Sequence, residues 1–136
     1  MRLYLDACIW RDYWEGRSDR FRPLGEWALR AINACVVSGG SILFSRVVIQ
    51  EIRKYYDAVE TEKIFSLVPK EQLVEVELTR QEVSEARELC RTRAVAFGDA
   101  LHAVIARNND AILVSRDRHF LLLMDIVEVR LPEELL

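Results

Sequence analysis

The stretch Ala111-Ile112-Leu113-Val114 is an uninterrupted apolar run, and it ends abruptly in Ser115-Arg116-Asp117. A short apolar run without a polar face is typical of a strand that is buried on both sides. Ile42-Leu43-Phe44 has the same character. Two such strands predict a parallel sheet, because strands of this kind occur where helices cover both faces of the sheet.

Strand and helix patterns alternate in both directions from these two runs. Met1–Asp6 alternates and ends in an acid, and Leu73–Leu78 alternates as a half-exposed strand near a sheet edge. We therefore expect about five strands, at residues 1–6, 42–44, 73–78, 111–114 and 126–129.

The segments between the expected strands carry helical spacing or helix caps. Thr79-Arg80-Gln81-Glu82 is a capping box, and Gly39-Gly40 is typical of a helix end. Ser45 is expected to cap the helix that follows the second strand. We expect helices around Trp10–Trp14, from Pro23 to Gly39, from Ser45 to Tyr56, over 60–67, from Thr79, from Phe97 to Asn108, and a short one from Arg118.

Length and composition bound the protein class. The 136 residues are 51% hydrophobic and 30% charged, which excludes disorder and predicts one α/β domain over residues 1–136. No apolar run approaches the ~18 residues of a membrane span, and Asp6 interrupts any signal-peptide pattern, so we expect a cytoplasmic protein without a membrane partner. The three cysteines form no CxxC pair, which argues against a disulfide framework or a zinc site.

Four acidic residues occupy unusual positions. Asp6 and Asp117 follow expected strands, Glu51 lies in the helix that leaves the second strand, and Asp99 opens a helix in an apolar neighbourhood. The carboxyl ends of parallel strands are where ligand sites form in such sheets. Each acid alone has an ordinary explanation, as a helix cap, a turn residue or an exposed helical position. If the four converge, their mutual repulsion requires a cation or bound protons.

Carboxylates without histidine or cysteine partners suit Mg²⁺ or Mn²⁺ rather than zinc. His102 and His119 are the only histidines, too few for a zinc centre by themselves. A metal held in this way can activate water for attack on a phosphodiester. The net charge of −3 conceals several arginines near the four acids that could bind phosphate: Arg11, Arg46, Arg53, Arg91, Arg93, Arg116 and Arg118.

Four stretches together resemble the PIN domain family. They are Leu3-Tyr4-Leu5-Asp6, Ser45 to Glu51, Gly98-Asp99-Ala100-Leu101-His102-Ala103, and Val114-Ser115-Arg116-Asp117-Arg118-His119-Phe120. The resemblance implies a three-layer, Rossmann-like fold and a Mg²⁺- or Mn²⁺-dependent ribonuclease. Many small members of the family are VapC-type toxins, which form homodimers and are inhibited by an antitoxin. By this resemblance we expect a toxin ribonuclease of the VapC type that acts on RNA, forms a homodimer and has an antitoxin partner.

The resemblance also assigns roles to particular residues. Asp6, Glu51, Asp99 and Asp117 would bind metal and orient the water, and Ser115 would support them through hydrogen bonds. RNA contacts are expected, more weakly, from four residues near these acids: Arg46, Arg116, Arg118 and His119.

The sequence departs from the family pattern after the first acid. Ala7-Cys8-Ile9 replaces the small hydroxyl-containing turn expected there. His102 is expected to be a packing residue, and Trp10 and Trp14 to make core or dimer contacts, with base stacking as the alternative. Two other functions stay open: a PIN nuclease of RNA processing without an antitoxin, and a catalytically silent module that binds RNA or a partner.

Overall fold

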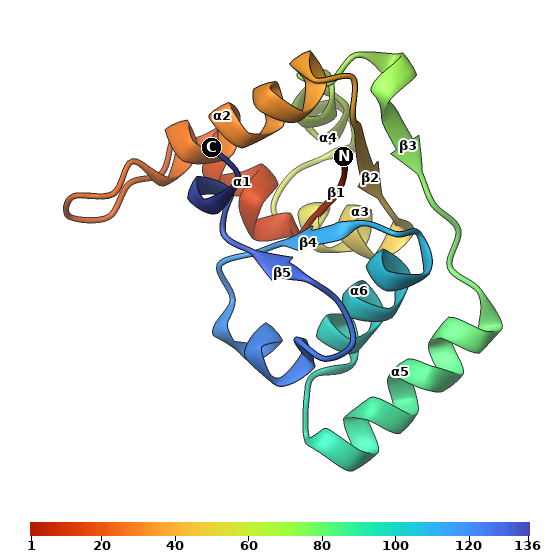
Figure 1. Ribbon diagram of the computed structural model, residues 1–136. Coiled ribbons are helices and arrows are strands. Elements are labelled where there is room, and N and C mark those ends of the chain that lie inside the picture. The colour runs from red at the N-terminus through yellow and green to blue at the C-terminus, as the bar shows by residue number, and fades with distance from the viewer.

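The computed structural model describes residues 1–136 and contains a five-stranded sheet with helices on both sides (Figure 1). None of the helices is both long enough and apolar enough to cross a membrane. The elements follow in the order β1 (Arg2–Leu5), α1 (Ala7–Glu15), α2 (Leu24–Val37), β2 (Ser41–Phe44), α3 (Arg46–Ile52), α4 (Ala58–Phe65), η1 (Lys70–Gln72), β3 (Leu73–Glu75), α5 (Arg80–Arg93), α6 (Phe97–Asn108), β4 (Ile112–Val114), η2 (Arg118–Leu123), β5 (Val129–Arg130) and η3 (Pro132–Leu135).

All strand pairs are parallel, and the strand order is β3-β2-β1-β4-β5. The central strand β1 pairs Leu3 with Ile42 on one side and with Ile112 on the other. Leu3, Tyr4 and Leu5 are fully buried, as a strand covered on both faces must be. The predicted three-layer α/β fold with a parallel sheet of about five strands is confirmed.

The strand order determines where the helices lie. The chain passes from β1 to β2 to β3 in one direction through α1–α4, then returns to β4 and β5 through α5, α6 and η2. Because such crossovers are right-handed, the two sets of helices cover opposite faces of the sheet (Figure 1). The direction reverses beside β1 and β4, and in open α/β sheets ligands bind outside the carboxyl ends of the strands at such a point.

Local sequence signals account for the helix ends. Thr79 forms the predicted capping box with Glu82 at the start of α5, and Gly39 takes a left-handed backbone (φ 79°) after α2. Ser45 occupies the N-cap position of α3 but makes no side-chain capping bond. The capping role predicted for its hydroxyl was wrong, because that hydroxyl contacts the Tyr4 hydroxyl at 2.6 Å instead.

Two expected strands are shorter or shifted. β3 stops at Glu75 rather than at residue 78, because its partner β2 ends at Phe44 and the chain there turns into α3. The last strand is Val129–Arg130 rather than 126–129. Ile126 and Val127 instead donate backbone hydrogen bonds to the Leu123 carbonyl as the chain leaves η2.

The expected helices near the N-terminal half also need correction. α3 ends at Ile52 rather than reaching Tyr56, and α4 spans 58–65 because Asp57 caps it through the Glu60 amide. Trp10 is fully buried and packs edge-on against Phe65 at 4.6 Å between ring centroids, so it is a core residue and cannot stack on a base. Trp14 is half buried, and its indole N–H donates to Glu60.

Candidate active site

The structure brings the four acids to the carboxyl edge of the sheet. Asp6 directly follows β1 and is the N-cap of α1, and Asp117 follows β4 and is the N-cap of η2. Glu51 lies in α3, which leaves β2, and Asp99 lies in the first turn of α6. The acids form two neighbouring groups, each completed by a histidine.

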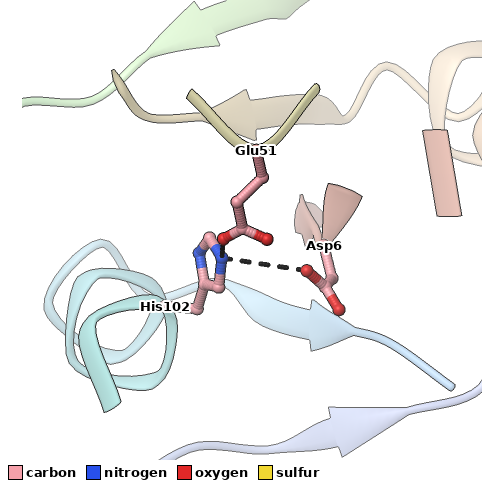
Figure 2. A group of neighbouring side chains, drawn as sticks. All are labelled: Asp6, Glu51 and His102. Atoms are coloured by element: carbon pink, nitrogen blue, oxygen red, sulfur yellow. Dashed lines mark hydrogen bonds and ion pairs between the residues drawn. The ribbon is translucent and has the colours of Figure 1, made fainter. Parts of the chain in front are cut away.

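The first group consists of Asp6, Glu51 and His102, whose ligand atoms lie within 4.8 Å of one another. His102 Nε2 is hydrogen-bonded to Glu51 Oε1 and lies 3.7 Å from Asp6 Oδ1 (Figure 2). The imidazole is almost completely buried, whereas about a third of the Glu51 side chain is exposed. This group is therefore held from beneath by the histidine and opens toward solvent on the carboxylate side.

The second group consists of Asp99, Asp117 and His119, whose ligand atoms also lie within 4.8 Å of one another. His119 Nδ1 lies 3.1 Å from Asp117 Oδ1 and 3.8 Å from Asp99 Oδ2. The His119 side chain is 75% exposed, and the Asp99 side chain only 18%. In this group the His119 side chain lies on the solvent side, and the Asp99 side chain lies beneath it.

Electrostatic repulsion links the two groups. Burial, together with the negative charges of Asp117 and Asp6, raises the pKa of Asp99 to about 6, although His102 and His119 partly offset this. Asp99 therefore interacts with an acid of each group. Carboxylates that raise one another's pKa in this way bind a cation or retain a proton near neutral pH.

Buried donors fix the first acid. The Ala7 amide donates to Asp6 Oδ1 at 2.7 Å, and the Ser115 hydroxyl donates to Oδ2 at 2.8 Å. Ser115 Oγ also accepts a hydrogen bond from the Asp117 amide at 3.0 Å, so one hydroxyl connects the acids that follow β1 and β4. Cys8 Sγ donates to Asp6 Oδ2 at 3.3 Å. Burial raises the pKa of the Cys8 thiol, which keeps it protonated and able to occupy the place of the missing hydroxyl residue as a donor.

A chain of buried polar groups behind Glu51 was not predicted from the sequence. Tyr4 hydroxyl lies 2.6 Å from Ser45 Oγ and 2.7 Å from His102 Nδ1, and His102 in turn contacts Glu51. Burial disfavours the charged imidazole, but the hydrogen bond to Glu51 and the negative charges of Asp6, Glu51 and Asp99 raise the pKa of His102. The available signal was a tyrosine in an apolar strand and a histidine on an apolar helix face, since buried polar groups need partners.

The arginines expected near the acids divide into two classes. Arg116 is largely buried, binds Glu133 through both terminal nitrogens and lies 3.4 Å from Asp12, so its guanidinium is not available to RNA. Arg11, Arg91 and Arg93 are also paired with acids. Three are exposed without an ion pair: Arg46, Arg53 and Arg118.

The donor set fits a hard divalent cation. Four carboxylates could supply oxygen ligands. Each group also contains one histidine, and neither group contains a cysteine. Oxygen-rich sites of this kind suit Mg²⁺ or Mn²⁺. Burial and the charges of Asp117 and Asp6 raise the pKa of Asp99, and a cation beside these carboxylates would offset the repulsion between them.

Comparison with known families agrees with the fold. The sequence matches the PIN domain family over residues 3–123. The chain belongs to the PIN domain family. No curated protein matches the sequence. The matched residues include all four acids and Ser115.

Similar solved structures of PIN proteins come from toxin–antitoxin systems. A toxin–antitoxin complex from Klebsiella pneumoniae is 18% identical with a TM-score of 0.69, covering 96% of this chain and 97% of that one. VapBC2 from Rickettsia felis, bound to a DNA fragment from its promoter, is 14% identical with the same TM-score and covers 96% and 98%. FitAcB from Neisseria gonorrhoeae is 18% identical with a TM-score of 0.63, covering 97% and 98%. At these identities the likeness establishes the fold.

Proposed function

We propose that this PIN domain is a Mg²⁺- or Mn²⁺-dependent endoribonuclease, acting as a single domain over residues 1–136. The observation that carries the proposal is the convergence of four carboxylates at one edge of the sheet, where burial and the neighbouring acids raise the pKa of Asp99. An arrangement that repels itself without a cation is costly for folding and useful for metal-assisted hydrolysis. PIN domains are in general nucleases, which favours this chemistry over other uses of a divalent ion.

In this proposal Asp6, Glu51, Asp99 and Asp117 hold the cation. When bound, the cation would lower the pKa of a water molecule and offset the charge that develops on the phosphate. Ser115 and Cys8 keep the Asp6 carboxylate aimed at the site through their hydrogen bonds. Asp99 lies beside Asp117 and Asp6, and its repulsion from them would be relieved when the cation binds.

The structural neighbours favour a VapC-like toxin with an antitoxin as its protein partner. We further propose that the chain assembles as a homodimer, as the family resemblance implies. We propose a cytoplasmic location, where RNA substrates are available. A PIN nuclease of RNA processing would have the same site without the antitoxin, and a small antitoxin gene adjacent to this one would decide between them. A silent binding module is disfavoured because all four acids are present at the site.

Cleavage of labelled single-stranded RNA with Mg²⁺, Mn²⁺ or EDTA tests the proposal, with Asp99→Asn as the matched variant. We expect cleavage that requires metal and is lost in Asp99→Asn. A folded protein that cleaves no RNA with either metal, across a total-RNA substrate, would contradict the ribonuclease assignment and favour the silent module.

A further inference from the structure

A groove beside Glu51 is lined by positively charged side chains that form no ion pair with an acidic residue. It has a volume of about 450 Å³ between α3, α5 and the start of α6. Its polar and charged rim consists of Arg46, Gln50, Glu51, Lys54 and Arg87, and Phe97 and Gly98 line the end nearest α6. The groove therefore shares Glu51 with the acidic site and continues away from it.

The three cations of this groove differ from most arginines of the protein. Nine of the sixteen arginines pair with an acidic side chain. Arg46, Lys54 and Arg87 are exposed and make no ion pair, although the chain is acidic overall. Unpaired cations on one groove create a local positive field that attracts an anionic ligand.

Two further features of the groove suit a nucleotide chain. Ala96, the N-cap of α6, makes no side-chain capping bond, so the first amides of this 12-residue helix remain available to an anion. Phe97, the first residue of α6, is 40% exposed, and an exposed aromatic ring can stack on a base. Phosphate-binding and base-stacking groups thus lie side by side, two residues before Asp99.

We propose that this basic groove binds single-stranded RNA on one side of the scissile phosphate, with Arg46, Lys54 and Arg87 contacting phosphates and Phe97 stacking on a base. The inference rests on the proposed ribonuclease function and assigns the surface along which its substrate would lie. An exposed Phe97 ring can stack on an unpaired base, which favours a single strand over a duplex in this groove. An acidic peptide or a second copy of this chain would be a different occupant.

The test measures binding separately from cleavage. The Kd of a fluorescent single-stranded oligoribonucleotide is determined by anisotropy over a series of salt concentrations, in the Asp99→Asn background with Mg²⁺. Arg46→Gln and Arg87→Gln should each weaken binding severalfold and reduce the slope of log Kd against log salt by about 0.7. Phe97→Leu should weaken binding about tenfold at all salt concentrations.

Arg80→Gln is the matched control, because Arg80 is exposed and unpaired on the same helix α5 but lies outside the groove. Equal affinities for Arg46→Gln, Arg87→Gln and Arg80→Gln would overturn the proposal. So would equally tight binding of a duplex of the same sequence, or an effect of the variants on dimerisation alone. If the wild type cleaves RNA and the groove variants bind RNA with unaltered affinity, the groove proposal fails and the ribonuclease assignment stands.

The buried polar chain behind Glu51 carries a second, independent inference. If Ser45 donates to Tyr4 and Tyr4 donates to His102 Nδ1, then His102 Nε2–H points at Glu51, and every group in the chain is satisfied. No other side chain is hydrogen-bonded to the Glu51 carboxylate. We infer that His102 is a positioning residue that holds Glu51 beside Asp6, with Glu51 Oε2 left for the cation.

Mn²⁺ affinity measured by calorimetry tests this role without relying on catalysis. His102→Leu removes the donor and should weaken Mn²⁺ binding about tenfold or more, as loss of a group that orients a metal ligand typically does. His102→Gln retains an N–H donor and should restore most of the affinity, and Tyr4→Phe should give an intermediate value. Ile105→Val is the control, since Ile105 is a fully buried residue one turn along the same helix.

Wild-type Mn²⁺ affinity in a folded His102→Leu variant would show that the histidine only packs. Equal losses in His102→Leu and His102→Gln would also overturn the inference, because a donor at this position would then not matter. A loss in Ile105→Val as large as that in His102→Leu would assign the effect to general destabilisation. Thermal denaturation of each variant identifies those that are folded.

Discussion

The two acidic groups of the site are built in opposite ways. In the Asp6–Glu51–His102 group the histidine is buried and the acids receive hydrogen bonds from it, from Ser115 and from a backbone amide. In the Asp99–Asp117–His119 group the histidine is exposed and Asp99 is largely buried, and this burial together with the charges of Asp117 and Asp6 raises the pKa of Asp99. Hydrogen-bond donors fix both acids of the first group, whereas in the second group the His119 amide donates to Asp117 and Asp99 accepts no hydrogen bond.

The difference suggests a division of labour within one site. Preorganised ligands reduce the cost of ordering side chains when the cation arrives. A repelled carboxylate instead gains most from the cation, because binding removes its repulsion. Perturbing the second group should therefore change charge and catalysis most, and perturbing the supports of the first group should change metal affinity and geometry.

The largest expected effect is that of Asp99→Asn. The amide is nearly isosteric but carries no negative charge, so it would hold the cation more weakly, and RNA cleavage should fall by about 10²–10⁴ or more. The same variant should be more stable than the wild type without metal near pH 7, because one repelling charge is gone. Cleavage assays and thermal denaturation measure the two effects, and retained cleavage would mean that Asp99 is not at the reacting centre.

Metal should stabilise the protein, and more strongly at higher pH. The pKa of Asp99 is about 6 in the folded protein and near 3.9 when unfolded, so the folded state holds a proton that the unfolded state loses between these values. The free energy of unfolding without metal should therefore fall as pH rises from about 4 to about 6. At a hundredfold excess over Kd, metal should add about 2.7 kcal/mol.

Denaturation with and without Mg²⁺ at pH 5 and pH 7.5 measures this dependence. The metal-induced rise in melting temperature should be larger at pH 7.5, and Asp99→Asn should reduce the pH dependence. A metal-induced rise in melting temperature that is the same at both pH values would contradict the prediction that repulsion at Asp99 distinguishes the second group from the first.

Ser115→Ala should have an intermediate effect on the first group. It removes the donor to Asp6 and the acceptor of the Asp117 amide, so metal affinity should fall about tenfold and stability by about 1–3 kcal/mol. Calorimetric titration with Mn²⁺ and urea denaturation measure these effects. Ser84→Ala, an exposed serine in α5, is the control. Unchanged affinity in Ser115→Ala would show that Asp6 needs no support from this hydroxyl.

His119→Gln should have the smallest effect. The side chain is 75% exposed, and exposed ion pairs contribute about 0–1 kcal/mol. Metal affinity should change by no more than about threefold in the same titration. A loss as large as that of Ser115→Ala would show that the exposed histidine supports its group as strongly as the buried one supports the other.

The sequence was sufficient for the fold and for placing Asp6 and Asp117 at one edge of the sheet, because both follow from strand order. Two strands that are apolar on both faces require a covered parallel sheet, and acids after such strands reach the same edge. The position of Asp99 did not follow from the pattern, because its helix leads toward β4 rather than away from the end of a strand. The sequence also did not show the ends of β3 and β5, which depend on how far the partner strands extend. The Tyr4–His102–Glu51 contacts join residues far apart in sequence, so no local pattern contains them.

The ion pairs of Arg116 with Asp12 and Glu133 could not be predicted from the sequence either. Its neighbours Ser115 and Asp117 face the acids, whereas its own guanidinium packs over the Trp27 ring and binds Asp12 and Glu133. The loop after β4 is thus anchored on the side remote from the acids, partly by a glutamate of the final turn η3. Shortening the chain by its last five residues, or altering Glu133, would loosen the loop that carries Asp117. Residues of η3 thereby anchor the loop that carries Asp117.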